Sequence, residues 1–351
     1  MDRYPITARS LEKYFHINGD QLERVYKDYL SGFRDWAEAS HASSWLVFPD
    51  NIGPHLSIDE TALTVGELYT IVSNKAGHGG SGSIVAIVNG TRVEDVVDAL
   101  KNIPYEMRAG VHEITMDLSE SMHAIAEAAF PEAMITADRF HVQQVVSDAM
   151  QEMRMQLKRE ARNRDVEARE QHKLKLERRS KSRKADKTDK RGRKPKRKNE
   201  AYVPERLSNG DTEMELLTRC RYLLMQSADK WTESQKIRAR LLFERFPQMR
   251  QAYSVNHSLR MIFNARHKDM DEARNSLRKW YNKVTDFDSK LFNSASATIY
   301  EHEDEILNDF IYRSTNASAE SLNAKIKNFR AQLHGVVDVE FFLYRVSLIY
   351  A

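Results

Sequence analysis

The chain has 351 residues, of which 41% are apolar and 30% charged, and it contains one cysteine, Cys220. This length suffices for two or three domains, and a single cysteine excludes a disulfide framework or a cysteine-rich zinc site. No stretch approaches the ~18 apolar residues of a membrane-spanning helix, and no apolar signal segment follows Met1. The composition therefore predicts a soluble, cytoplasmic protein without membrane contact.

The net charge of +3 conceals an uneven distribution. Residues 173–198, the basic strip, hold fifteen Lys or Arg and three acidic residues, a net of +12, so the rest of the chain carries −9. Such a one-signed strip indicates a polyanionic partner such as nucleic acid, the alternative being a solvated linker. The strip is nearly free of apolar residues after Leu176, so we expect it to be disordered in the free protein.

Residues 6–36 have the apolar spacing of two helices, one from Thr7 to about Phe15 and one from Asp20 to about Trp36. A DNA-binding helix-turn-helix and a simple packing hairpin both fit this pattern.

From residue 56 to residue 138 the pattern predicts an α/β fold. Five strands are expected, at 56–61, 68–73, 83–88, 113–117 and 133–138. Helices at 93–102 and 121–130 precede the last two strands, which indicates a meander continued by crossover helices. The glycine-rich segment 77–82 is followed by a strand and not by the helix that a phosphate loop requires, so we predict a hairpin loop there.

Beyond residue 142 the signals are helical. A polar helix over 142–170 leads into the basic strip, and residues 211–312 form a series of helices. Another helix begins near Ala319, and an apolar segment, 341–350, follows a break at Gly335.

Three carboxylates could carry chemistry. Asp59 lies in the first strand, facing away from Leu56 and Ile58, and Asp117 ends the fourth strand. Acidic side chains on neighbouring strands repel unless a cation lies between them, and Mg²⁺ prefers such oxygen ligands. Two metals roughly 4 Å apart can promote phosphoryl displacement, with Glu320 as the third acid. The alternative is that these residues serve only turns and a helix dipole.

Three blocks, 56–62, 113–142 and 316–327, resemble the DDE transposases of bacterial insertion sequences, specifically the ISL-type group. The helical stretch between them also resembles the family's insertion at four places, which are 231–235, 251–253, 280–281 and 306–310. The resemblance covers roughly 55–351. It implies an RNase H-like mixed sheet with flanking helices, interrupted by a large all-helical insertion.

The resemblance suggests four segments. Residues 1–52 would be a small helical segment, 53–150 the first part of the catalytic core, 151–312 the insertion containing the basic strip, and 313–351 the helices that complete the core. Family members commonly carry a cysteine-based zinc motif and a DNA-binding domain upstream. Here either residues 1–52 bind DNA, or a separate chain recognises the element ends, or the copy is shortened.

The resemblance also implies site residues. Asp59, Asp117 and Glu320 would be the catalytic acids and hold two Mg²⁺ ions, for which Mn²⁺ could substitute. Asp138 and His141 match the family's carboxylate-x-x-histidine signature and would support the site, although Asp138 remains a rival for second acid. The DNA-binding candidates are Asn323, Lys325, Lys327, Arg191, Arg193, Lys194, Lys196 and Arg197.

The function implied is transposition: metal-dependent cleavage at element ends and strand transfer into target DNA. The partners would be the terminal inverted repeats, the target DNA and a second copy of the chain, in the nucleoid of a bacterial cytoplasm. The alternatives are a structure-specific nuclease on the same fold and a non-catalytic DNA-binding relic.

Overall fold

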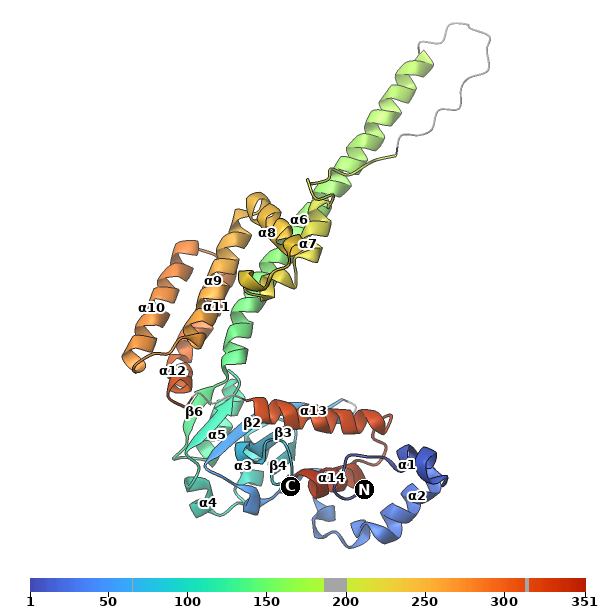
Figure 1. Ribbon diagram of the computed structural model, residues 1–351, viewed down its shortest axis with the longest axis vertical. Coiled ribbons are helices and arrows are strands. Elements are labelled where there is room, and N and C mark those ends of the chain that lie inside the picture. The colour runs from blue at the N-terminus through green and yellow to red at the C-terminus, as the bar shows by residue number, and fades with distance from the viewer. Residues whose placement is uncertain (65, 186–200, 313–315) are drawn as a thin grey trace. The chain divides into compact units, whose positions relative to one another are not determined.

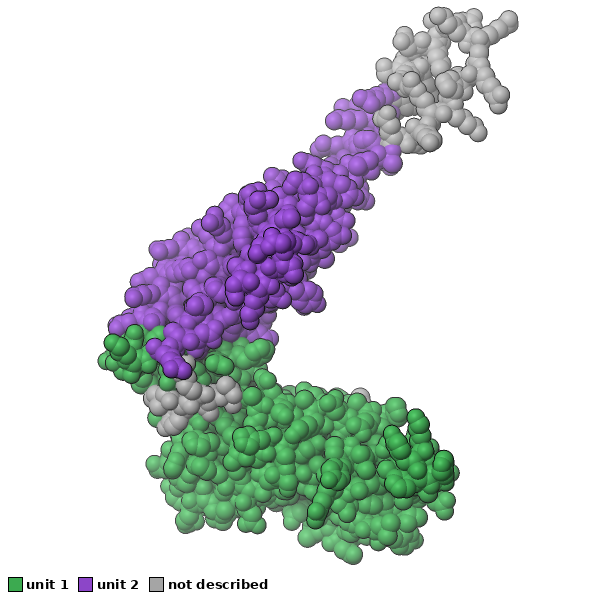
Figure 2. All heavy atoms as spheres, in the orientation of Figure 1, with its two compact units in different colours: residues 1–142, 267–274, 299–351 green, residues 143–266, 275–298 purple. Residues whose placement is uncertain are grey.

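The computed structural model describes residues 1–64, 66–185, 201–312 and 316–351. The chain forms two compact units, coloured separately in Figure 2. Unit 1 comprises 1–142, 267–274 and 299–351, and unit 2 comprises 143–266 and 275–298. Among the described helices, none combines the length and apolar character that crossing a bilayer requires.

Unit 1 contains a six-stranded mixed sheet (Figure 1). Its strands are β1 (Trp45–Val47), β2 (His55–Thr64), β3 (Glu67–Asn74), β4 (Ile84–Asn89), β5 (Glu113–Met116) and β6 (Met134–Ala137). In the order β1-β4-β3-β2-β5-β6, the first four strands are antiparallel neighbours, and β5 and β6 continue parallel to β2. The α/β class and the predicted hairpin at 77–82 are confirmed, whereas β1 was not predicted.

Parallel strands need crossover connections, which short helices provide here. They are α3 (Val93–Leu100) and α4 (Tyr105–Ala109) before β5, and α5 (Glu120–Ala129) between β5 and β6. Helices α13 (Ala317–Gln332) and α14 (Val339–Tyr350) supply Leu322, Phe329 and Phe342 to a core with Ile71 and Ile87 of the sheet.

Strand alternation decides which face Asp59 occupies. Leu56 and Ile58 of β2 belong to the apolar core that also contains residues of α3 and α5. Successive side chains of a strand point to opposite faces, so Asp59 points to the face covered by α13. The orientation predicted from the sequence is therefore confirmed.

The first residues of unit 1 pack on α14. Helices α1 (Ala8–Phe15) and α2 (Gly19–Val25) are followed by a π-helical turn, Tyr26–Leu30, and short 3-10 turns. The second helix was expected to reach Trp36, but Gly32, at φ +78°, ends it. The Arg345 guanidinium, 3% exposed, donates to the carbonyls of Met1, Tyr4 and Ile6, which ties this segment to α14.

Within its described residues, the regular secondary structure of unit 2 is helical. The helices of the long stretch between β6 and α13 are α6 (Arg139–Ala185), α7 (Glu213–Arg219), α8 (Glu233–Arg245), α9 (Pro247–Asn264), α10 (Met270–Phe287), α11 (Lys290–Glu301) and α12 (Glu303–Tyr312). Helix α12 belongs to unit 1, where Asn308 Nδ2 donates to the Ile135 carbonyl of β6 at 2.8 Å.

The basic strip is partly helical. Residues 173–185 continue α6, where we expected disorder. Lys, Arg, Glu and Leu are good helix formers, and extending an existing helix avoids the cost of nucleation. The remainder of the strip, 186–198, lies outside the described residues.

Candidate active site

The strand register brings three aspartates to one edge of the sheet. The last registered pairs are Ser57 with Thr115 between β2 and β5, and Met116 with Ala137 between β5 and β6. Continued by one or two residues, this register places Asp59, Asp117 and Asp138 side by side across three parallel strands, with Asp59 within β2 and Asp117 and Asp138 directly after the carboxyl ends of β5 and β6. In α/β sheets, ligands bind at this edge.

The Asp59 carboxylate is half-buried and accepts a hydrogen bond on each oxygen. Oδ2 accepts a hydrogen bond from Asn323 Nδ2 of α13 at 2.6 Å, and Oδ1 accepts one from the Glu60 backbone N–H at 2.8 Å. Burial raises the pKa of Asp59; the Glu60 N–H, His141 and Asn323 oppose this rise, and the charge of Asp117 adds to it. Asp59, Asp117 and His141 therefore share one electrostatic environment.

Asp117 and Asp138 each stand just before a helix. Asp117 Oδ1 accepts from the Ser119 N–H at 3.1 Å ahead of α5, and Asp138 Oδ1 accepts from the Phe140 N–H at 3.0 Å at the start of α6. Asp138 is 2% exposed, and its Oδ2 has no hydrogen-bond partner among the described residues. The nearest imidazole nitrogen, His141 Nε2, is 3.9 Å from it, which is beyond hydrogen-bonding distance.

The third predicted acid, Glu320, is exposed in the first turn of α13. It precedes Asn323 by three residues, about 4.5 Å along the helix axis. Because Asn323 contacts Asp59, the helix that carries Glu320 is bound to the aspartate row. Within the described residues, Asp59 and Asp117 are brought together, and Glu320 is not among the groups that shift the pKa of Asp59.

The glycine-rich hairpin loop holds α13 in place. Lys325 Nζ donates to the Gly79 carbonyl at 2.6 Å, and Ser318 Oγ donates to the Lys75 carbonyl at 3.3 Å. Gly79 has φ +69°, and a Cβ there would lie 3.1 Å from the Leu322 backbone nitrogen. The loop approaches the helix this closely because Gly79 lacks a side chain. The sequence analysis identified the loop but not its contact with α13.

The predicted DNA-binding residues differ in their surroundings. Asn323, 6% exposed, is engaged with Asp59, and Lys325 with Gly79, whereas Lys327 is exposed. The remaining candidates lie outside the described residues, namely Arg191, Arg193, Lys194, Lys196 and Arg197.

A half-buried ammonium group, not foreseen from the sequence, lies beside the aspartate row. Lys75 Nζ donates to Thr115 Oγ1 and lies 3.4 Å from Oε2 of Glu113, which is 1% exposed. Burial lowers the pKa of Lys75, and the charges of Glu113, Asp138 and Asp309 oppose this shift. A positive charge from the β3–β4 loop thus balances acids on β5 and beyond β6.

The oxygen donors at this edge fit a hard divalent cation. Burial raises the pKa of Asp59 and of Glu60, and Asp117 raises both further, so a cation bound here would favour the ionised carboxylates. Within the described ranges, no group of three or more His, Cys, Asp or Glu side chains forms a ready-made metal site. Mg²⁺ is commonly held by only one or two carboxylates together with substrate phosphates, which the pair Asp59 and Asp117 can provide.

The mixed sheet, the helices that flank it and the acidic edge define an α/β protein of the RNase H-like type. The family model of ISL3-type DDE transposases, described as a transposase, matches residues 56–346, and the chain belongs to this family. The resemblance drawn from the sequence is thereby confirmed. Comparison with curated proteins and with solved structures gave no match. Membership identifies DNA as the partner, and DDE transposases generally use divalent metal ions.

Proposed function

We propose that this transposase cuts DNA at the ends of its element and joins the strands to target DNA, with Asp59, Asp117 and Glu320 as the metal-holding acids. The observation that carries the proposal is the convergence of β2, β5 and α13: Asp59 and Asp117 share one electrostatic environment, and Asn323 links Asp59 to the helix of Glu320. Divalent ions bound there supply Lewis-acid assistance at the scissile phosphate and the attacking oxygen.

The protein's own groups prepare the acids for this task. The hydrogen bonds from Asn323 and from the Glu60 N–H fix the Asp59 carboxylate and favour its charged form. The Ser119 N–H orients Asp117 in the same way. Glu320 has an exposed carboxylate on the helix already attached to Asp59, which supports its choice as third acid.

Asp138 and His141 are assigned a supporting role. Asp138 Oδ2 is buried without a donor among the described residues, and His141 Nε2 lies 3.9 Å from it. His141 also lowers the pKa of Asp59. The pair would therefore tune the first acid without holding metal.

The remaining partners follow from the reaction. Two element ends must be joined, so we infer at least a dimer when both are bound. Recognition of the terminal repeats falls to residues 1–52 or to a separate chain. Lys327 and the basic strip would contact DNA phosphates, which gives affinity without sequence preference. We expect that Mn²⁺ can substitute for Mg²⁺. We also expect the protein to act on the DNA of the bacterial nucleoid.

Two matched substitutions test the assignment. Asp117→Asn should abolish cleavage of an element-end duplex in Mg²⁺ and leave binding to that duplex intact, because Asn removes the charge that holds the cation but touches no phosphate contact. Asp138→Asn should lower the cleavage rate by about 10–100-fold, as is typical of groups that support metal ligands.

The reverse order of effects would place the second acid on Asp138. Normal cleavage by both variants would refute metal-dependent transposition by these residues. Cleavage without joining, in an assay that supplies target DNA, would instead identify a structure-specific nuclease, and the wild-type chain binding DNA without cutting it would identify a relic.

A further inference from the structure

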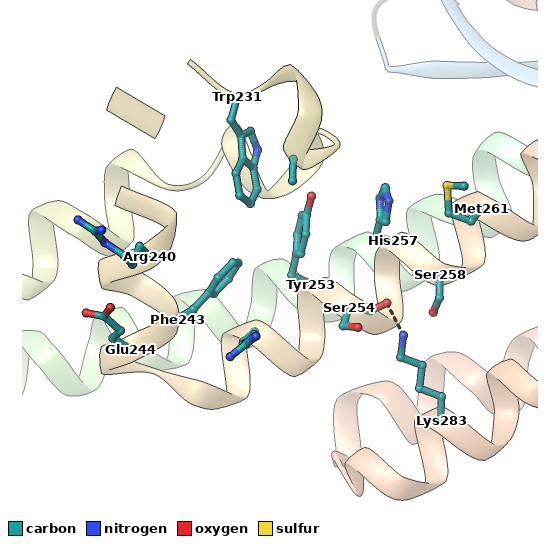
Figure 3. Close-up of a pocket in the computed structure, with 12 residues that line it drawn as sticks. Trp231, Arg240, Phe243, Glu244, Tyr253, Ser254, His257, Ser258, Met261 and Lys283 are labelled. Carbon is teal, nitrogen blue, oxygen red and sulfur yellow. Dashed lines mark hydrogen bonds between the residues drawn. The ribbon is translucent and has the colours of Figure 1, made fainter. Parts of the chain in front are cut away.

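Unit 2 contains an aromatic pocket of about 760 Å³, which lies within the ~300–1,000 Å³ typical of small-ligand sites. Trp231 lies in the loop before α8, and its ring, Phe243 of α8 and Tyr253 of α9 point toward one another (Figure 3). The ring centroids of Trp231 and Tyr253 are 5.3 Å apart, and those of Phe243 and Tyr253 are 5.7 Å apart. His257 stacks on Tyr253 with an interplanar angle of 8°.

Helix α9 contributes one whole face to this pocket. Its opposite face is buried in unit 2 through Met249, Ala252, Val255, Asn256, Leu259 and Phe263. The pocket face repeats at helical spacing through Arg250, Tyr253, Ser254, His257, Ser258 and Met261. An aromatic and polar face that is not needed for the core is available for a ligand.

The rings are held in place from behind. Trp231 Nε1 donates to the Leu223 carbonyl at 2.8 Å, and the Tyr253 hydroxyl donates to the Gln226 carbonyl at 2.8 Å. Both polar tips are thus bound to backbone, and since Tyr253 already stacks on His257, a ligand would contact the ring surfaces that line the pocket. His257 Nδ1 is buried without a hydrogen-bond partner among the described residues, which leaves one polar atom for a ligand.

Basic side chains surround the rings. Arg240, Arg250 and Lys283 line the pocket, and one acid, Glu244, lies among them. Proteins that bind unpaired nucleotides commonly combine aromatic and cationic side chains, because bases stack on the rings while Arg and Lys contact the phosphates.

We propose that this pocket binds an unpaired base of single-stranded DNA, stacked on Tyr253 and Trp231 with its phosphates near Arg240 and Arg250. The proposal extends the proposed function and rests on its DNA substrate, because base pairs at a duplex end fray and expose unpaired bases. An unstacked base is the ligand that such a pocket recognises, and any of the four bases has the required face.

Binding to a fluorescein-labelled single-stranded oligodeoxynucleotide, measured by anisotropy with the full chain in EDTA, tests the pocket. Tyr253→Ala should weaken this binding roughly 5- to 150-fold, the range for losing one base–aromatic stack. Tyr253→Phe retains the ring and should bind normally. Tyr222→Ala removes a tyrosine of unit 2 that is 70% exposed and does not line the pocket, and it should also bind normally.

Two further measurements keep the proposal refutable. An oligonucleotide carrying 5-iododeoxyuridine should photocrosslink to the peptides of Trp231 or Tyr253. If Tyr253→Ala does not fold, as judged by a loss of its helical circular dichroism signal, a second variant at the exposed Arg250 provides the test. Arg250→Gln should reduce the slope of log K against log salt by about 0.7, the value for one single-strand phosphate contact.

Equal affinities for Tyr253→Ala and Tyr222→Ala, or an unchanged salt slope for Arg250→Gln, would overturn the proposal. Tighter binding of RNA of the same sequence would overturn its assignment to DNA. In EDTA the assay measures DNA binding without metal-dependent cleavage, so its result does not depend on the proposed catalytic acids. A negative result for the pocket is therefore distinct from a failure of Asp117→Asn to abolish cleavage.

Discussion

Replacing Asn323 with leucine should shift the acid limb of cleavage toward higher pH. Asn323 Nδ2 donates to Asp59 Oδ2 at 2.6 Å in a site where Asn323 is 6% exposed. Hydrogen bonds to charged groups contribute about 1.5–3 kcal/mol, which corresponds to about 1–2 pKa units. Leucine has nearly the same size but no donor, so the pKa of Asp59 should rise by that amount and a larger fraction of the enzyme should be protonated and inactive.

The same change has a defined effect on stability. The folded pKa of Asp59 is already raised above its ordinary 3.8, so the ionised carboxylate disfavours the folded state. Without its donor, the free energy of unfolding at neutral pH should fall by a further ~1.5–3 kcal/mol. This loss should diminish as the pH falls through the folded pKa, because protonated Asp59 carries no charge to stabilise.

Cleavage rates across pH and urea unfolding at neutral and acid pH provide the two measurements. Asn328→Leu, on the exposed side of the same helix, is the matched control and should change neither profile. If Asn323→Leu leaves the acid limb in place and destabilises the protein equally at every pH, then Asn323 only packs, and its assigned role toward Asp59 is wrong.

Three other outcomes are expected. Gly79→Ala should reduce cleavage and lower the melting temperature more than Gly82→Ala, because both residues have positive φ but only the Cβ at 79 would press on α13, 3.1 Å from the Leu322 nitrogen; equal effects would show that backbone strain alone matters. Lys75→Met should destabilise the protein by about 1–3 kcal/mol in urea unfolding, since the buried Glu113 carboxylate loses its ammonium partner and retains His55 Nδ1 at 3.1 Å and the Thr115 hydroxyl, and adding Glu113→Gln should recover part of the loss; no recovery would contradict the pairing. Deleting residues 173–198 should flatten the dependence of log K on log salt in duplex binding, and an unchanged slope would identify a linker.

Features governed by short-range periodicity could be predicted from the sequence. Alternating residues predicted β2, and with it the face on which Asp59 lies. The short strand β1, Trp45–Val47, has too few residues to show a period, and it is a strand only because it pairs with β4. Gly32 ended a helix that apolar spacing alone extended to Trp36.

The parts of the site that could not be predicted depend on contacts between distant residues. Helical spacing placed Asn323 one turn after Glu320, but its bond to Asp59 arises from the docking of α13. Likewise, Lys75 lies in a hairpin loop, where a lysine is normally solvated, and only the folded sheet places it against Thr115 and Glu113. No sequence pattern indicates the contact of Asn323 with Asp59 or of Lys75 with Thr115 and Glu113, because both contacts arise only when the tertiary structure forms.

The attachment of α13 to β2 also sets the time at which the site can exist during synthesis. Asp59 and Asn323 are 264 positions apart in the chain. At ~5–20 residues per second, a ribosome needs about 15 to 50 s to travel from one to the other. During that interval the growing chain presents Asp59 and then Asp117 without the Asn323 amide, which favours the charged form of Asp59, and without Glu320. Under the proposed assignment, a nascent transposase would be unable to cut DNA until α13 has been synthesised, and a chain terminated before residue 320 would lack the third proposed acid.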